Sequence, residues 1–377
     1  MLARSSSSGL QLPAADAFPA YPASWYLFCE SRRLRCGPVS QSLLGRRLVA
    51  FRTASGRVAV MDAHCAHLGA DLGQGSVVGE TIRCPFHHWR YGADGVCAAV
   101  PNLDRAPSFA RLRTYPAVER HGYLFFFNGA EPLFPLPFFF GEAADDYVAG
   151  KMFSYLADCS WYMNSAHAFD RQHFAAVHDR ELLAPPAIDC PAPFARRNSY
   201  PARIVGRTLM DRILRAVAGR TVKITLTIWG GTLAAITADY ERLRSGFIIV
   251  MRPLENGHTL CQGIVFARRA PLPLRFLDPL RLGVRTLFTH GYLKEEARRL
   301  RGTRYQPRSL GPNDLEMTDF FRWVAALPQA GSDPRGTDKS EDDYENINRS
   351  PAAAVRSGRA VGVGVVASAA GQGGGGS

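Results

Sequence analysis

Cysteine and histidine residues alternate in two short segments of the first third of the chain. One residue separates Cys65 from His67, and after sixteen more residues Cys84 and His87 follow with two residues between them. Two loops that each offer a thiolate and an imidazole fit a [2Fe–2S] cluster whose two irons are held by the two cysteines and the two histidines, respectively. Zinc sites use the same residue types but normally pair cysteine with cysteine along the chain. The mixed loops therefore favour the iron–sulfur cluster over zinc.

A second pattern of metal-binding residue types lies further along the chain and reads Asp170-x-x-His173-x-x-x-x-His178. On a helix, at about 100° per residue, His173 lies to one side of Asp170 and His178 to the other. Two histidines with one further carboxylate form the facial triad of Fe(II) oxygenases, which leaves positions open for O₂ and substrate. A satisfied polar patch on a helix is the alternative, and the upstream cluster motif favours the iron.

The carboxylate that completes such a triad is expected near the end of the chain, in the segment GPNDLEMTDFFRW. Its candidates are Asp314, Glu316 and Asp319. Asp314 opens the last predicted helix, where a carboxylate often serves as the N-cap. We nevertheless choose Asp314 as the third iron ligand, with Asp319 as the second choice.

The elements that must position these residues fall into two regions. In residues 21–135, short β-rich runs separated by glycine turns predict an all-β domain. Residues 145–327 mix helical and strand patterns, which predicts an α+β domain with an antiparallel sheet. Residues 1–20 are expected to form a disordered leader. Residues 328–377 are first rich in charged residues and then in alanine, glycine and serine, which predicts a disordered tail.

The strands expected in the first region are Arg47–Arg52, Arg57–Asp62, Thr81–Cys84 and Tyr123–Asn128. In the second region the expected helices are Cys159–Asp179, Pro279–Arg301 and Asp314–Ala326, and the expected strands are Val222–Trp229, Phe247–Pro253 and Thr259–Arg268.

The composition narrows the class of protein. No stretch reaches the roughly 18 clean apolar residues that a spanning helix needs, so a soluble chain is expected. The net charge of +12 is scattered and accompanies no nucleic-acid-binding motif, which excludes nucleic acid as the expected partner and leaves room for docking to an acidic electron-transfer protein. Eight cysteines spread over 377 residues and interleaved with histidines indicate metal binding in a reducing compartment, the cytoplasm.

The residues around the first motif carry a family resemblance. The segments His64–Ala70 and Cys84–Tyr91 resemble the Rieske non-haem iron oxygenases, most nearly the aminopyrrolnitrin oxygenase group. Oxygenase components of ketosteroid hydroxylases are similar at greater distance, with a like spacing from Asp314 to Trp323. The resemblance implies an N-terminal all-β Rieske domain followed by a catalytic α+β domain of helix-grip (START-like) type, assembled as a head-to-tail homotrimer.

The resemblance also implies roles for particular residues. Asp170 matches the family's aspartate that bridges an iron-ligating histidine to a cluster histidine of the neighbouring subunit, and so acts in electron transfer. His167 stands where many relatives have asparagine, which raises the possibility of an altered catalytic site.

The hypothesis is a Rieske oxygenase component. A separate flavin reductase, directly or through a ferredoxin, would deliver electrons from NAD(P)H to the cluster bound by Cys65, His67, Cys84 and His87. A mononuclear Fe(II) at His173, His178 and Asp314 would use O₂ to oxidise a small aromatic or polycyclic substrate, as a monooxygenase and including arylamine nitrogen as a target. The alternatives are a hydroxylase or desaturase of a steroid-like ring, an oxygenase-like protein whose site has drifted, and a Rieske electron carrier, which would have no use for the second motif.

Overall fold

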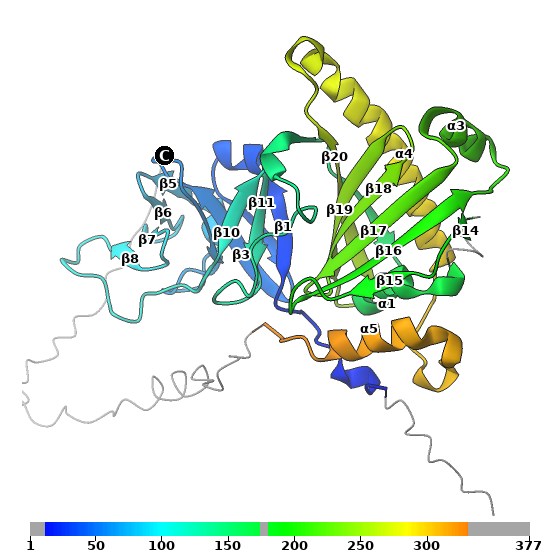
Figure 1. Cartoon of the computed structure of the whole chain (residues 1–377). Helices are drawn as coiled ribbons and strands as arrows, with labels where there is room; N and C mark the ends of the chain where they lie inside the picture. The colour runs from blue at the N-terminus through cyan, green and yellow to red at the C-terminus, as the bar shows by residue number, and fades with distance from the viewer. Residues whose placement is uncertain (1–11, 174–179, 331–377) are drawn as a thin grey trace, which may run out of the picture. The chain divides into compact units, whose positions relative to one another are not determined.

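A computed structural model describes residues 12–173 and 180–330, which belong to one unit of the chain (Figure 1). Three small antiparallel sheets build its N-terminal part. One joins β1 (Trp25–Glu30), β11 (Tyr123–Phe127) and β10 (Ala117–Arg120). Another joins β2 (Val39–Leu43), β3 (Arg46–Arg52), β4 (Val58–Asp62) and β9 (Thr114–Tyr115). The last joins β5 (Ser76–Val78), β6 (Thr81–Arg83), β7 (Arg90–Gly92) and β8 (Cys97–Ala99).

One large antiparallel sheet dominates the rest of the described chain. Its strands run in the order β12-β20-β19-β18-β17-β16-β14, with β13 paired to β20 and β15 to β16. Their bounds are Tyr147–Ala149, Phe153–Ala157, Arg180–Leu182, Ala187–Asp189, Ala195–Ile204, Thr221–Trp229, Leu233–Tyr240, Arg244–Pro253 and Thr259–Arg268 for β12 to β20 in chain order. The helices are α1 (Trp161–Ala166), α3 (Leu209–Ala218), α4 (Asp278–Arg299) and α5 (Leu315–Ala325).

Sequence patterns account for the central strands of this sheet. In β17, Val222 and Ile228 are buried on one face while Lys223 points to the other, as the period of two residues in a strand requires. Gly230 and Gly231 then turn the chain into β18 with φ of 52° and 74°. Two successive positive φ values are typical of the tight hairpin turn that glycine favours.

The two predicted domains share one hydrophobic core. Tyr26 and Phe126, which belong to the three-stranded sheet, are completely buried. Their cluster continues through Leu233 and Ile248 of the large sheet. The other face of the large sheet packs against α1, α4 and α5 around Trp161. The large sheet is therefore covered on both faces, which holds the cluster-binding part and the α+β part together.

The predicted α+β class and its antiparallel sheet are confirmed, and strands such as β20 match the expected ranges. The prediction of one continuous helix over Cys159–Asp179 is wrong. Helix α1 ends at Ala166, a 3₁₀ turn spans His167–Phe169, and a new helical turn begins at Arg171.

The structure differs from the expected leader as well. Phe18, within the predicted disordered stretch, is buried and stacks on Tyr162 with ring centroids 4.0 Å apart. Ala23 donates a backbone hydrogen bond to Pro328. The predicted tail lies outside the described residues from position 331 onward. No helix in the described ranges combines the length and the apolar character needed to cross a bilayer.

Candidate metal centres

The two predicted cluster loops come together at the tips of short strands. The first loop closes through a hydrogen bond from the Cys65 amide to Ala70 O (3.0 Å), and the second through one from the Cys84 amide to Trp89 O (2.8 Å). The rings of His67 and His87 lie 4.6 Å apart, and Trp89 stacks on His67 at 4.6 Å with an interplanar angle of 2°. The four side chains therefore converge on one point.

The two cysteines and the two histidines of the cluster site differ in their exposure to solvent. Cys65 and Cys84 are 4% and 2% exposed, whereas both histidines are exposed. Burial raises the pKa of the Cys65 thiol, and the neighbouring Cys84 raises it further. A thiolate there needs a bound cation to stabilise it, so two adjacent buried thiols fit one iron of a [2Fe–2S] cluster, with the imidazoles of the other iron facing solvent.

Tyr91 supplies a hydrogen bond to the cluster site. Its hydroxyl lies 3.1 Å from Cys65 Sγ and accepts a hydrogen bond from the Ala66 amide, also at 3.1 Å. An iron-bound thiolate has no proton to donate, so with the cluster in place the hydroxyl would donate to the sulfur. Burial, and then the contact with Cys65, raises the pKa of Tyr91, so the phenol stays protonated and donates.

An ion pair between Arg47 and Asp71 stabilises the first loop. Arg47 donates to Asp71 Oδ2 from Nη2 (2.8 Å) and Nε (3.0 Å), and Ser40 donates to the same oxygen at 3.0 Å. Burial works against ionisation of Asp71, but these hydrogen bonds and one from the Gly73 amide outweigh it and lower the pKa of Asp71. The loop is thus fixed by an ionised, well-bonded carboxylate.

The second centre begins where the predicted helix breaks. Asp170 ends the 3₁₀ turn, and its Oδ1 accepts from the amides of Gln172 (2.9 Å) and His173 (3.2 Å). This is the N-cap geometry, which starts a new helical turn. The cap places the His173 side chain inward, where it is 6% exposed.

His173 meets two partners that form a compact donor cluster. Its Nε2 lies 2.6 Å from Glu296 Oε1, and His167 Nε2 lies 3.7 Å from the same oxygen. The ligand atoms of His167, His173 and Glu296 all lie within 4.8 Å of one another. Two imidazoles and one carboxylate at such separations fit the donor set of a mononuclear Fe(II) site.

The electrostatics of this cluster suit a metal. Burial lowers the pKa of His167, so its imidazole is neutral and offers a lone pair. Glu296 is itself buried at 6% exposure. Burial, with a further contribution from Glu296, raises the pKa values of Tyr155 and Tyr200 well above the usual range. His167, Tyr155 and Tyr200 therefore bring no positive charge to the buried carboxylate, and a bound cation would stabilise it.

The structure places the other predicted site residues as follows. His178 lies outside the described residues. Asp314 Oδ2 accepts from the Gly311 amide at 2.8 Å ahead of α5 and lies outside the His167–His173–Glu296 cluster. Asp319, with a side chain 75% exposed, pairs with Arg322. Glu316 pairs with Arg171 at 3.2 Å. Asp314 as a ligand stays a prediction.

Sequence reasoning missed Glu296, although a signal was present. Leu293 and Ala297 of α4, with Leu300 directly after the helix, form a buried stripe at helical spacing, and Glu296 occupies the same face. A carboxylate on an otherwise apolar helix face is costly to bury without a partner. That pattern marks Glu296 as a functional candidate.

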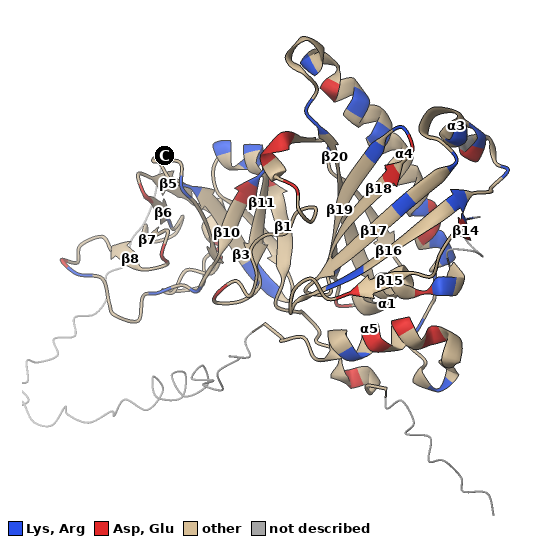
Figure 2. Cartoon of the chain, viewed as in Figure 1, with Lys and Arg blue, Asp and Glu red and all other residues tan. Residues whose placement is uncertain are grey.

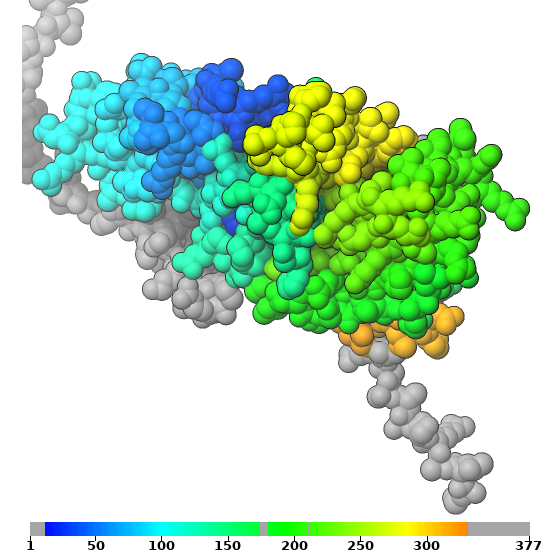
Figure 3. All heavy atoms as spheres, turned by 45° about the horizontal axis from the view of Figure 1, so that its top comes forward, coloured from blue at the N-terminus to red at the C-terminus, as the bar shows by residue number. Residues whose placement is uncertain are grey.

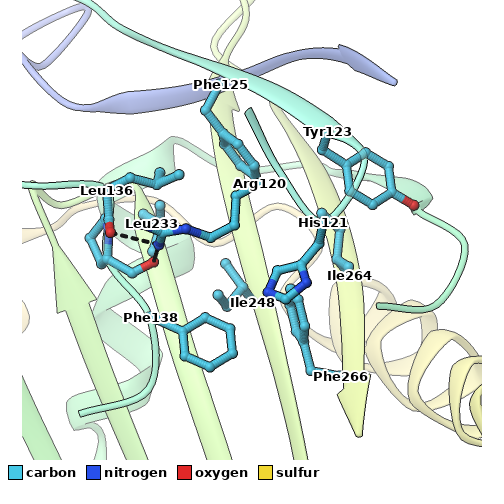
Figure 4. Close-up of a pocket in the computed structure, with 11 residues that line it drawn as sticks. Arg120, His121, Tyr123, Phe125, Leu136, Phe138, Leu233, Ile248, Ile264 and Phe266 are labelled. Carbon is cyan, nitrogen blue, oxygen red and sulfur yellow. Dashed lines mark hydrogen bonds between the residues drawn. The ribbon is translucent and has the colours of Figure 1, made fainter. Parts of the chain in front are cut away.

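A small cavity lies between the two regions of the shared core (Figure 4). It holds only about 10 Å³ and is lined by His121, Phe138 and Phe266, among other side chains. Arg120 closes one side by donating to Leu136 O (2.8 Å) and Pro137 O (3.2 Å). Such a void has room for one water at most, so it is a packing defect and no substrate pocket.

Comparison with known proteins assigns the class of the first centre. Residues 24–116 match the family described as the Rieske [2Fe-2S] domain. This range contains all four predicted cluster ligands, so this part of the chain is a Rieske [2Fe-2S] domain.

Sequence relatives match part of the chain. Aminopyrrolnitrin oxygenase of Pseudomonas fluorescens is 43% identical over 132 residues, which cover 33% of this chain and 36% of that protein. Cholesterol 7-desaturase of Xenopus laevis is 35% identical over 178 residues, covering 44% and 38%. A 3-ketosteroid-9-alpha-monooxygenase oxygenase component of Rhodococcus rhodochrous is 37% identical over 128 residues, covering 34% of each. The chain thus matches well under half the length of these relatives.

Solved structures share the fold beyond the cluster domain. Dicamba monooxygenase bound to 3,6-dichlorosalicylic acid superposes with a TM-score of 0.59 at 18% identity, covering 80% of this chain and 96% of that one. NdmA of Pseudomonas putida CBB5 with caffeine gives 0.58 at 18%, covering 80% and 89%. At this identity the likeness shows a shared fold over most of the chain.

Proposed function

We propose that this protein is the oxygenase component of a Rieske-type system that oxidises a small, apolar organic substrate. The observation that carries the proposal is the buried cluster of His167, His173 and Glu296 behind the α+β sheet. An electron carrier would need the [2Fe–2S] loops only. A second, independent donor set of two histidines and a carboxylate would hold an iron that accepts the electrons from the cluster.

The chain's own residues divide the work between two sites. Cys65, Cys84, His67 and His87 would hold the [2Fe–2S] cluster. His173 and Glu296 would hold Fe(II), with His167 or His178 as the further imidazole. Bound iron of this type supplies the open positions at which O₂ and substrate react. The Asp170 carboxylate would keep His173 in place through the N-cap, beside the electron-transfer role that the resemblance implies.

The surroundings of the second site favour apolar substrates. The hydrophobic cluster on that face of the sheet includes Phe153, Ile236 and Ile249 together with Phe320. Aromatic and aliphatic walls with few polar groups suit a ring compound whose position is set by shape. The names of the relatives, which include an aminopyrrolnitrin oxygenase, a cholesterol 7-desaturase and a 3-ketosteroid-9-alpha-monooxygenase component, agree with an aromatic or polycyclic substrate.

The partners and assembly belong to the same proposal. A separate flavin reductase, directly or through a ferredoxin, would deliver electrons from NAD(P)H. A head-to-tail homotrimer would bring the cluster of one subunit near the iron site of the next. A cytoplasmic location fits the free, unpaired state of the eight cysteines.

Metal analysis of three proteins tests the proposal and the identity of the carboxylate ligand. Iron and acid-labile sulfide would be measured per chain on anaerobically purified wild type, Glu296→Gln and the matched variant Asp314→Asn, with electron paramagnetic resonance after reduction. About three irons and two sulfides are expected in the wild type. Glu296→Gln should lose about one iron and keep the Rieske signal, and Asp314→Asn should keep all.

Two outcomes would contradict this assignment. Loss of iron in Asp314→Asn but not in Glu296→Gln would make Asp314 the ligand. About two irons in all three proteins, with the Rieske signal intact, would favour an electron carrier or an oxygenase-like protein without a working site.

A further inference from the structure

Helix α4 is apolar on two faces, and only one of them is covered in the described structure. Leu282 and Leu293 face the sheet, where α4 packs against β20 and β13. Leu280, Val284 and Leu287 recur at helical spacing on another face and are 67%, 47% and 72% exposed. A surface helix that needed only to cover the sheet would place polar residues there.

The exposed stripe continues into the segment before the helix. The 3₁₀ helix η6 (Leu272–Leu277) exposes Leu272 at 77% and Phe276 at 76%. Together η6 and the first half of α4 project beyond the end of the sheet (Figures 1 and 3). Single exposed apolar residues are ordinary, but a contiguous set of large ones marks an interaction surface.

A second apolar helix stands at the same end of the sheet. Helix α3 exposes Leu209 (71%), Ile213 (44%) and Val217 (61%), again at helical spacing. It connects the end of β16 to the start of β17, and η6 follows the end of β20. Because β16 to β20 are consecutive antiparallel strands, these two connections leave the same end of the sheet. Strands spaced at about 4.8 Å put them roughly 19 Å apart.

The charge at this end is strongly positive. Residues 205–221, 240–244 and 268–288 hold eleven arginines against three acidic residues, Asp211, Glu241 and Asp278 (Figure 2). Two of the acids are engaged locally, since Asp211 pairs with Arg180 and Asp278 with Arg281. From outside these segments, Glu142 compensates Arg244 and Arg268, and Asp239 also pairs with Arg244. A clear excess of arginine remains beside the two apolar stripes.

We propose that this end of the sheet, defined as α3, η6 and the first half of α4, docks on the surface of a membrane that contains anionic lipids. Exposed leucine and phenylalanine beside arginine is the composition of helices that lie in the bilayer interface. Anionic headgroups match the arginine excess. A second copy of the same basic surface would meet it with like charge, which disfavours self-association here. The C-terminal half of α4 carries Glu296, so the docked helix reaches the candidate iron site.

Vesicle co-sedimentation of the full chain tests this docking. Phosphatidylcholine vesicles would be compared with vesicles that also contain phosphatidylglycerol. We expect binding to the anionic vesicles that weakens with added salt. The triple variant Leu272→Ser, Phe276→Ser, Leu280→Ser should bind at least about tenfold more weakly, because each large apolar side chain adds to the partition free energy.

A control variant and the oligomeric state complete the experiment. Leu103→Ser with Leu156→Ser removes leucines that are 55% and 54% exposed elsewhere in the fold, and it should bind as the wild type does. Cluster content by absorbance shows that each variant is folded. Equal binding of wild type and triple variant would overturn the proposal. The proposal would also be overturned if the wild type did not bind vesicles but formed an oligomer that the triple variant does not form. The surface would then join copies of the chain.

Discussion

Removal of the Tyr91 hydroxyl should lower the reduction potential of the cluster. The hydroxyl lies 3.1 Å from Cys65 Sγ, to which it would donate once the sulfur is an iron-bound thiolate, and it accepts from the Ala66 amide. Reduction adds negative charge to the cluster, and a hydrogen bond to a charged acceptor is roughly twice as strong as one to a neutral acceptor. With a net value of about 1 kcal/mol for the weaker bond, the reduced state gains about 1 kcal/mol more from Tyr91 than the oxidised state does. For one electron that corresponds to roughly 40 mV.

The variant Tyr91→Phe keeps the buried ring and removes only the hydroxyl. A redox titration followed by the visible circular dichroism of the cluster measures the shift. Tyr123→Phe is the matched control, because its hydroxyl donates to Gly150 O at 2.9 Å and touches neither loop. The reasoning fails if Tyr91→Phe retains a Rieske signal and a wild-type potential, or if the potential rises.

Three further changes follow from the packing and the charges. Phe126→Ala should lower the free energy of unfolding by roughly 3–5 kcal/mol in urea, because the ring is 0% exposed within the shared core; a loss below about 1 kcal/mol would mean that the two regions do not share that core. Burial lowers the pKa of His121, so stability should decline as the pH falls below about 6.5, where the unfolded chain takes up the proton. His121→Asn tolerates the φ of 52° there and should flatten that decline in denaturation curves, whereas an unchanged slope would assign it elsewhere. Asp170→Asn keeps an N-cap residue, so the fold and the iron content should persist while reoxidation of the reduced cluster slows; reoxidation at the wild-type rate would remove Asp170 from electron transfer.

Local patterns account for what could be predicted from the sequence. The cluster loops are each closed by bonds within a few residues, such as Cys84 to Trp89, so short-range spacing is enough to recognise them. The Rieske class, the α+β class and the main strands follow for the same reason, since the alternation in β17 or β20 is visible residue by residue. The position of His173 was harder, because a helix was expected where Asp170 in fact ends one turn and caps the next.

By itself, the sequence determined that this chain has a Rieske cluster domain followed by an α+β domain. The spacing of the cysteines and histidines and the periodicity of the strands both involve residues that are close together in the chain. Only the tertiary structure decided that Glu296 meets His173 at 2.6 Å, since helix α4 must first pack across β20 and β13 before that carboxylate reaches His167 and His173. The same holds for the basic, apolar end of the sheet. Its segments are distant in the chain, and antiparallel pairing of β16 to β20 alone brings them to one edge.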